Sequence, residues 1–428
     1  MDDRVDAIIV GGGPAGSTAA YILAKAGLEV ILVERGNYGG AKNMTGGRLY
    51  AHSLRKIMPD FAGSAPVERK VLKERISMLT SDSACTIEFQ SNRLGRPGQD
   101  SYTVLRAVFD RWLMDRAEEA GAMVVPGIRV DDILVKDGKV CGIVAGQDEM
   151  EASVVVLADG VNSLLAQKLG MKRQVQPSQV AVGVKEVIQL PKAVMEDRFN
   201  LTGDEGLSWL FAGECSNGMT GGGMLYTNKE SVSLGLVCGL SHIGQSDKTL
   251  VQMLEDFKAH PAVAPLIQGG TLAEYSGHLV PEAGFGMIPE LYRDGVVVIG
   301  DAAGLVINIG YMVRGMDLAV ASADCAAQAI IMAKVKNDFS AGSLARYKQL
   351  LDESFVMQDL KTFRNFPAFM ENPRIFREYP NLLADLFTDM FAVNGEPSKP
   401  LLKKGFRHVK KVGIRTLIKD GWKGVRSL

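Results

Sequence analysis

The chain has 428 residues, of which 46% are hydrophobic, so it can bury more apolar surface than a single core usually holds. We therefore expect a globular protein of two or three substructures. A formal net charge of −1, a pI of about 6.6 and the absence of a base-stacking motif disfavour nucleic-acid binding. The N-terminal residues lack the basic and apolar regions of a signal peptide, which predicts a cytoplasmic chain.

No transmembrane helix is expected. The longest apolar stretch, residues 296–333, is interrupted by Asp301, Arg314, Asp317 and Asp324, and each charge is costly at the centre of a bilayer. The five cysteines are scattered, without a CxxC pair or an iron–sulfur spacing. We expect them to be isolated buried thiols and expect no metal site.

The first predicted unit is a strand, a helix and a second strand. Residues 5–10, VDAIIV, are typical of a buried strand, residues 15–26 form an alanine-rich helical segment that ends at Gly27, and residues 30–33 form an apolar run. Short buried strands on either side of a helix are typical of a parallel βαβ unit.

The loop of this unit matches the dinucleotide-binding pattern GxGxxG. Gly11 should make the turn, Gly13 should let a pyrophosphate approach the backbone, and Gly16 should let the helix meet the strand. Glu34, at the end of the second strand, is placed to accept hydrogen bonds from a ribose. This unit alone does not distinguish FAD from NAD. Its candidate binding residues are Gly11, Gly13, Ala15, Gly16, Glu34 and Arg35.

A second strand–helix group begins at residues 102–105 and continues through residues 109–122, where apolar positions recur at helical spacing. Residues 124–145 alternate like strands, and Asp137-Gly138 indicates a hairpin. Residues 154–163, VVVLADGVNS, are an apolar strand that ends in Asp159-Gly160. Taken alone, this motif is as well explained by an ordinary Asp-Gly turn.

Residues 180–275 are β-rich and punctuated by glycine, which indicates a second domain interleaved with the first. Within it, residues 218–228, GMTGGGMLYTN, favour a bulged hairpin over a backbone segment that approaches a ligand. The chain then returns to a buried strand at residues 296–299. Gly300 and Asp301 follow, and the small residues up to Gly304 suit close contact with a flavin, with Asp301 accepting from a sugar hydroxyl.

The chain from about residue 340 is predicted to be helical and rich in phenylalanine, for which core packing is favoured over a path for a prenylated quinone. Residues 401–428 hold nine Lys or Arg and one acidic residue. Apolar residues alternate with these basic ones, and Gly413 and Gly421 should break any long helix. Three interpretations remain open: a segment that lies on a membrane, a contact with an acidic subunit, or a solvated face.

The three motifs, at residues 11–34, 154–163 and 296–319, together resemble the FAD-binding fold of the p-hydroxybenzoate hydroxylase and glutathione reductase group. In that group the order is GxGxxG, a DG box and a GD box. The resemblance implies that FAD is the cofactor, that Asp301 binds its ribityl chain, and that Arg106, in LRAVFDRWL, lies near its pyrophosphate.

A closer resemblance narrows the family. Residues 34–50, ERGNYGGAKNMTGGRLY, residues 308–330 and the closing KKVGIRTLIKDGWKGV are similar to the FixC-type relatives of electron-transfer-flavoprotein:quinone oxidoreductase. This implies electron transfer from a two-subunit electron-transfer flavoprotein to a quinone, within an electron-bifurcating complex of the FixABCX type. The quinone oxidoreductase carries a four-cysteine [4Fe–4S] module, but no cysteine here follows Cys325, so a separate ferredoxin-like subunit is implied.

Two further groups of residues are candidates for contact with the isoalloxazine. Lys42, Asn43 and Thr45 lie in a glycine-rich loop that ends at Gly46, and a solvated loop is the alternative. By resemblance, Arg314 and Gly315 precede a helix whose N-terminus points at the pyrimidine edge, where its dipole would stabilise a reduced anionic flavin. Ordinary packing at a helix start explains Arg314 equally well. The remaining candidates are Arg106, Asp159, Gly160, Gly300, Asp301 and Gly304.

We therefore predict an α/β fold in which an FAD-binding Rossmann-like domain is interleaved with a β-rich quinone domain and followed by a helical region with a basic tail. The expected ranges are 1–75, 100–180 and 276–335 for the first, 76–99 and 181–275 for the second, and 336–428 for the third. The expected protein is a cytoplasmic FAD-dependent electron-transfer oxidoreductase, and peripheral contact with the cytoplasmic membrane face is one of the options for its basic tail. The alternatives are a self-contained prenyl reductase of the geranylgeranyl type, an aromatic monooxygenase, and a structural assembly subunit.

Overall fold

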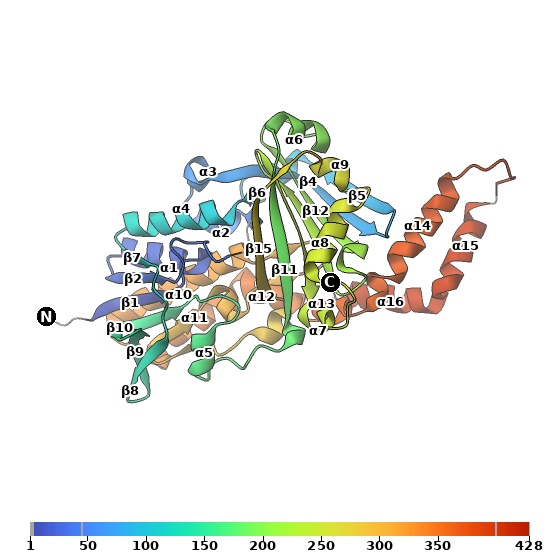
Figure 1. Ribbon diagram of the computed structural model, residues 1–428. Helices are drawn as coiled ribbons and strands as arrows, with labels where there is room; N and C mark the ends of the chain where they lie inside the picture. Colours follow the sequence, from blue (N-terminus) through green and yellow to red (C-terminus); the bar gives the residue numbers. More distant parts are fainter. Residues whose placement is uncertain (1–3, 44–45, 399, 428) are drawn as a thin grey trace.

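Two β-sheets form the body of the protein, and a helical C-terminal region extends from it (Figure 1). The computed structural model describes residues 4–43, 46–398 and 400–427. In Figure 1 the first sheet lies near the N-terminus, the long green strands of the second stand beside it, and the red helices project away on the far side. The α/β class expected from the sequence is confirmed.

The first sheet contains the predicted βαβ unit. Its main path runs β16-β17-β10-β1-β2-β7, and the neighbours from β17 to β7 are parallel. Its central strands are short runs rich in Val and Ile, as expected where both faces are covered. The strands are β1 (Val5–Val10), β2 (Val30–Glu34), β7 (Met123–Pro126), β8 (Asp132–Lys136), β9 (Lys139–Ala145), β10 (Asp148–Leu157), β16 (Tyr292–Arg293) and β17 (Val296–Val298).

The second sheet has nine strands, in the order β15-β11-β14-β13-β12-β4-β6-β3, with β5 paired to β4. Its pairs are antiparallel except β4 with β12. The strands are β3 (Gly47–Tyr50), β4 (Val67–Leu79), β5 (Ala84–Gln90), β6 (Ser101–Val104), β11 (Val180–Gln189), β12 (Glu205–Gly213), β13 (Gly221–Thr227), β14 (Ser231–Gly239) and β15 (Thr271–Pro281). A small ribbon joins β18 (Ile307–Asn308) to β19 (Val313–Arg314).

Sequence patterns located most strands but not the sheet to which each belongs. The strand predicted at residues 102–105 is β6, which pairs with β3 and β4 of the second sheet, whereas its helix α4 packs against α1 beside the first sheet. The expected domain boundaries after residues 75 and 275 fall inside β4 and β15. The hairpin signal at Asp137 is confirmed, since β8 and β9 pair across it.

Residues 218–228 contain β13, which forms a hairpin with β14 without the expected bulge, because the β13–β14 register is continuous from Gly221 to Thr227. A Cβ on Gly221 would lie 2.2 Å from the carbonyl oxygen of Val237, and one on Gly223 would lie 2.7 Å from the ring of Phe257. These glycines are therefore explained by close neighbours, an adjacent strand at Gly221 and helix α8 at Gly223.

Helix α1 packs between α4 and α10, and α10 also packs on α11. By length and composition alone α10 could cross a membrane, but 56% of its most apolar window is buried inside the protein, as in a core helix. The helices up to this point are α1 (Pro14–Lys25), α2 (His52–Ile57), α3 (Phe61–Ser64), α4 (Arg106–Glu119), α5 (Leu164–Lys168), α6 (Lys192–Phe199), α7 (Leu240–Ile243), α8 (Leu250–Ala259), α9 (Ala264–Ile267), α10 (Met316–Lys336) and α11 (Ala341–Glu353).

The C-terminal region is helical, as predicted. Its helices are α12 (Phe355–Thr362), α13 (Phe366–Met370), α14 (Glu378–Phe391), α15 (Leu401–Val412) and α16 (Ile414–Ser427). Gly413, with a φ of 94°, separates α15 from α16, but Gly421 lies inside α16 and does not break it, contrary to expectation. The Asp420 carboxylate of α16 accepts two hydrogen bonds from Arg374, at 2.6 and 2.9 Å, which ties this helix to the segment before α14.

Candidate functional site

The glycine loop after β1 is shaped by its own backbone at two positions and open at the third. A Cβ on Gly11, whose φ is 109°, would lie 2.4 Å from the carbonyl oxygen of Ala158, and one on Gly16 would lie 1.9 Å from that of Gly11. A Cβ on Gly13 would meet no atom within 4 Å. The loop therefore packs tightly against β10 and α1 while leaving free space at the N-terminal end of α1, where a phosphate would be favoured.

Glu34 at the end of β2 is buried and holds this loop. Its Oε2 accepts a hydrogen bond of 2.6 Å from the backbone N–H of Gly12, and its Oε1 accepts one of 2.6 Å from that of Gly36. Each carboxylate oxygen can accept a further hydrogen bond. Glu34 can thus fix the loop and still receive ribose hydroxyls, while the neighbouring Arg35 is exposed.

The DG and GD motifs meet because β10 and β17 are adjacent parallel strands, whose carboxyl ends share one edge. Between them lies Lys172, which is only 7% exposed. Its Nζ donates to the carbonyl oxygens of Val161, at 2.9 Å, and Ala302, at 3.0 Å. Burial lowers the pKa of Lys172, and the carboxylates of Asp159 and Asp301 act in the opposite direction. Lys172 therefore ties together the two motif loops.

The Asp301 carboxylate fits a ligand hydroxyl. It is half-buried, and within residues 4–43, 46–398 and 400–427 it accepts no hydrogen bond. Burial raises the pKa of this carboxyl, and nearby Arg106 partly offsets the effect. Asp159 differs, because it accepts a hydrogen bond of 3.1 Å from the hydroxyl of Ser163.

Glycines allow the GD loop to approach α1. A Cβ on Gly300 would lie 2.7 Å from that of Ala15, and one on Gly304 would lie 2.9 Å from that of Met287. Gly160, with a φ of 81°, has open space around it. The predicted glycines of the two motifs and Ala15 thus lie together at the edge of the first sheet.

Arg106, at the start of α4, is held by a carboxylate that the sequence analysis did not single out. Its Nε and Nη2 donate to the two oxygens of Asp110, at 2.8 and 2.7 Å, and Asn43 donates to the same carboxylate at 3.0 Å. Lys42 is exposed, and Thr45 lies outside the described residues. Asn43 is therefore an anchor of its loop to α4.

Gly46, at the end of this loop, accepts a 2.6 Å hydrogen bond from Lys185 of β11, which is only 3% exposed. Burial, and secondarily the charge of Arg106, lower the pKa of Lys185 to about 7. A lysine within the apolar run AVGVKEVI was the one sequence feature that could have drawn attention to it. Lys172 carried no such signal, because its partners are backbone carbonyl groups, 11 and 130 residues away in the sequence.

Arg314 is engaged in packing at the start of α10. Its Nε and Nη2 donate to Asp317, at 2.8 and 2.6 Å, and its Nη1 donates to Asp359 of α12 at 2.6 Å. Asp317 Oδ1 is buried without a partner among the described residues. Gly315 is the residue that precedes α10. Of the two interpretations of Arg314, its contacts favour the joining of α10 to α12.

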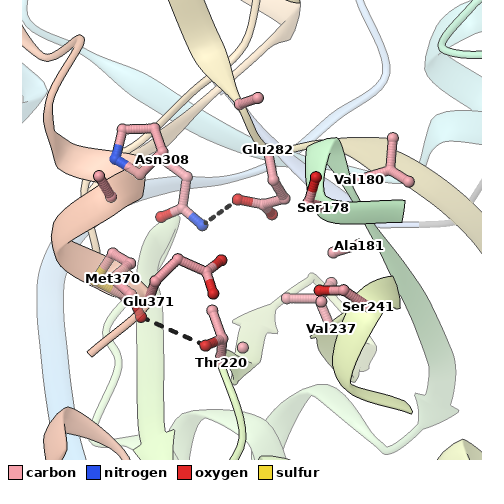
Figure 2. Close-up of a pocket in the computed structure, with 15 residues that line it drawn as sticks. Ser178, Val180, Ala181, Thr220, Val237, Ser241, Glu282, Asn308, Met370 and Glu371 are labelled. Atoms are coloured by element: carbon pink, nitrogen blue, oxygen red, sulfur yellow. Dashed lines mark hydrogen bonds between the residues drawn. The ribbon is translucent and has the colours of Figure 1, made fainter. Parts of the chain in front are cut away.

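A cavity of about 240 Å³ opens beside the segment that follows the GD motif (Figure 2). Asn308 reaches it only seven residues after Asp301. The walls come from the ends of β11, β13 and β14 and from α13, and they are largely small or apolar. The cavity is the kind of concave, mostly apolar space that accepts small organic ligands.

The five cysteines are free thiols, and four of them are buried. Within the part of the chain that the structure describes, no three His, Cys, Asp or Glu side chains are grouped so that they could hold a metal ion. The polar groups of the site are instead the buried carboxylate of Glu34 behind the glycine loop and the carboxylate of Asp301, which has no donor among the described residues, and the mostly apolar cavity lies nearby.

These features define an FAD-binding protein of the Rossmann-like type. The sequence model described as "FAD binding domain" matches residues 4–202, and the one described as "ETF-QO/FixC family C-terminal domain" matches residues 366–428. A probable electron transfer flavoprotein-quinone oxidoreductase, YdiS of Escherichia coli K12, is 56% identical over the full length of both chains. Protein FixC of Salmonella typhi is 54% identical over the same extent.

The chain belongs to the ETF-QO/FixC family, and it is an FAD-dependent electron-transfer oxidoreductase. Solved structures agree on the fold. A geranylgeranyl bacteriochlorophyll reductase-like protein from Thermoplasma acidophilum has a TM-score of 0.72 at 22% identity, with 96% of this chain and 98% of that chain covered. The flavin-dependent brominase Bmp2 has a TM-score of 0.66 at 15% identity, with 96% and 100% covered.

Proposed function

We propose that the protein takes electrons from a two-subunit electron-transfer flavoprotein and delivers them to a quinone, as the FixC-type subunit of an electron-bifurcating complex of the FixABCX type. The observation that carries this proposal is the end-to-end similarity to a relative named as an electron transfer flavoprotein-quinone oxidoreductase and to proteins named FixC. Bound FAD supplies the one- and two-electron chemistry, while the protein binds, orients and shields it.

The residues at the edge of the first sheet have suitable groups for each part of FAD. The free space at Gly13 suits the pyrophosphate, and Glu34 suits the adenosine ribose. Asp301, which has no protein donor among the described residues, suits a ribityl hydroxyl. Gly315 immediately precedes α10, whose N-terminal dipole would favour negative charge on the reduced flavin.

A separate ferredoxin-like [4Fe–4S] subunit is part of the proposal. The chain has no cysteine after Cys325, so its C-terminal region cannot supply four thiolates to a cluster. The cavity beside Asn308 is the proposed place for the quinone, because it is apolar and lies close in sequence to the GD motif.

The electron route predicts a two-stage change in the flavin spectrum of the purified protein under anaerobic conditions. Reduced electron-transfer flavoprotein should bleach the FAD absorbance, and a soluble quinone analogue should restore it, because each is a redox partner. NAD(P)H alone should cause no bleaching. If NAD(P)H bleaches the flavin and the reduced flavoprotein does not, the protein is a self-contained reductase and the proposal fails.

We also propose that α15 and α16 lie on an anionic membrane surface. Both helices expose large apolar side chains: Leu401, Leu402, Phe406, Ile414, Ile418, Trp422 and Val425. Their basic residues include several without a carboxylate partner among the described residues: Lys403, Lys410, Arg415, Lys419, Lys423 and Arg426. An apolar face flanked by lysine and arginine is typical of helices that lie in the headgroup region. Each basic residue contributes about 1 kcal/mol near an anionic leaflet.

The membrane contact predicts that the protein cosediments with phosphatidylglycerol-containing vesicles and only weakly with phosphatidylcholine vesicles. Phe406→Glu/Trp422→Glu should weaken binding to the former at least about tenfold, because burying each ring is worth about 1.5–3 kcal/mol. Val335→Glu, at a position on α10 that is 84% exposed, is the matched control and should bind like the native protein. If the native protein ignores vesicles but binds a ferredoxin-like subunit through α15 and α16, these helices form a protein contact instead.

A further inference from the structure

The cavity beside the GD motif has one polar end, where two partly buried side chains meet. Glu282, just after β15, turns its carboxyl into the cavity and meets Asn308 of β18, whose Nδ2 donates to Glu282 Oε2 at 3.1 Å (Figure 2). The Asn308 amide is itself oriented, because its Oδ1 accepts a hydrogen bond of 3.0 Å from the backbone N–H of Gly310. Asn308 therefore presents its N–H group to Glu282 and fixes the direction of the carboxyl.

The second oxygen of Glu282 determines what the cavity can recognise. Within the described residues, Oε1 has no hydrogen-bond partner, and the partly buried Glu282 side chain lines the cavity wall. Since Oε2 accepts from Asn308, a proton on the carboxyl is best placed on Oε1. The neutral carboxyl then offers a single O–H donor to the cavity, and its complement is a ligand that is apolar and carries a hydrogen-bond acceptor.

Resting on the function proposed above, we propose that Glu282, held by Asn308, donates its carboxyl proton in a hydrogen bond to a carbonyl oxygen of the quinone head group in this cavity. The small apolar side chains of Val180, Val237 and Ala283 provide walls that suit a quinone ring. Glu282 is then the residue that makes binding of the oxidised quinone depend on pH.

At the polar end of the cavity, Glu282 is the group whose titration near pH 7 would affect the ligand. Burial raises the pKa of Glu282 to about 7, and the hydrogen bond from Asn308 partly offsets this effect. The opposite end carries Glu371, after α13, which lies 3.5 Å from His242 of α7. On β15 the nearest titratable group is His278, whose ring contacts the backbone carbonyl of Leu279. The segments of η2 (Pro177–Gln179) and β18 that face the cavity carry no charged side chain.

The sign of the pH effect follows from the donor role. Well below pH 7 Glu282 is neutral and can donate, so quinone affinity should be constant there. Above pH 7 the carboxyl is ionised and repels a carbonyl oxygen, and a proton must be taken up for the ligand to bind. The apparent dissociation constant should then rise about tenfold for each pH unit, in proportion to the lost neutral fraction.

The test is calorimetric titration of the FAD-loaded, oxidised protein with decylubiquinone between pH 5.5 and pH 8.5, in buffers of different ionisation enthalpy. The native protein should lose about thirtyfold in affinity by pH 8.5 and should take up nearly one proton per ligand above pH 8. Glu282→Gln keeps an N–H donor without titrating, so its affinity should be independent of pH, without proton uptake. Glu282→Ala should bind weakly at all pH values.

Glu371→Gln is the matched control, because it removes the other carboxyl of the cavity and should keep the native pH dependence. A native affinity that does not change with pH, or a pH dependence that survives in Glu282→Gln, would overturn the inference. If the flavin is bleached by the electron-transfer flavoprotein and restored by quinone while binding ignores Glu282, the proposed function stands and this inference fails. If binding depends on Glu282 but the electron-transfer flavoprotein does not reduce the flavin, this inference stands and the proposed function fails.

Discussion

Gly13→Val should remove FAD from the protein while leaving the fold intact. Gly13 has φ and ψ of −80° and −176°, a conformation that valine also adopts, and a Cβ there would meet no protein atom within 4 Å. The space that the new side chain fills is the space proposed for the pyrophosphate. An overpacked contact costs about 1–3 kcal/mol, which corresponds to a loss of about 5-fold to about 150-fold in affinity.

The measurement is the FAD content and the thermal unfolding of the purified variant. Gly63→Val is the matched control, since a Cβ at Gly63 also meets no atom within 4 Å but lies in α3, and it should keep full flavin. Gly16→Val should misfold instead, because its Cβ would lie 1.9 Å from the carbonyl oxygen of Gly11. A Gly13→Val protein that retains full flavin would refute the phosphate assignment.

The motif glycines Gly11, Gly13 and Gly16 belong to the part of the fold that was most predictable from the sequence. Strand β1 was located to the residue, and α1 and β2 to within about one residue at each end, because buried parallel strands and a helix-start glycine loop leave strong local patterns. The motif also assigns a different task to each glycine, and the local geometry distinguishes them in the same order.

Sheet membership was not predictable, because it depends on contacts that no local pattern encodes. Strand β6 precedes α4 in the manner of a βα unit, yet it pairs with β3 and β4 in the second sheet. At Gly421 the local sequence pattern predicted a helix break that the structure does not have. One glycine inside a helix costs about 1 kcal/mol, and α16 continues through it with Asp420 fixed by Arg374.

The candidate site was predicted in its motifs but not in the side chains that brace it. Lys172 joins the DG and GD loops through the backbone carbonyls of Val161 and Ala302, which lie more than a hundred residues apart in the sequence. No sequence spacing therefore indicates this role. Asp110 could have been found, since it lies one helical turn after Arg106 on α4, where oppositely charged residues often pair.

Arg106 and Asp110 should show strong coupling in a double-mutant cycle of unfolding free energies. The Asp110 carboxylate is fully buried and accepts from Arg106 twice, so Arg106→Met leaves an uncompensated buried charge and should cost about 3–5 kcal/mol. In Arg106→Met/Asp110→Asn that charge is absent, and much of the stability should return. Denaturant unfolding of the native protein, both single variants and the double variant measures the coupling.

The same double variant separates the two roles that Arg106 can have. If Arg106 also lies near the FAD pyrophosphate, as the family resemblance implies, the double variant should regain stability but bind FAD more weakly than the native protein. If Arg106 only neutralises Asp110, stability and FAD affinity should recover together. Additive costs for the two single variants would contradict the pairing itself. If the two side chains pair, each single variant already loses their hydrogen bonds, so the double variant cannot lose them a second time.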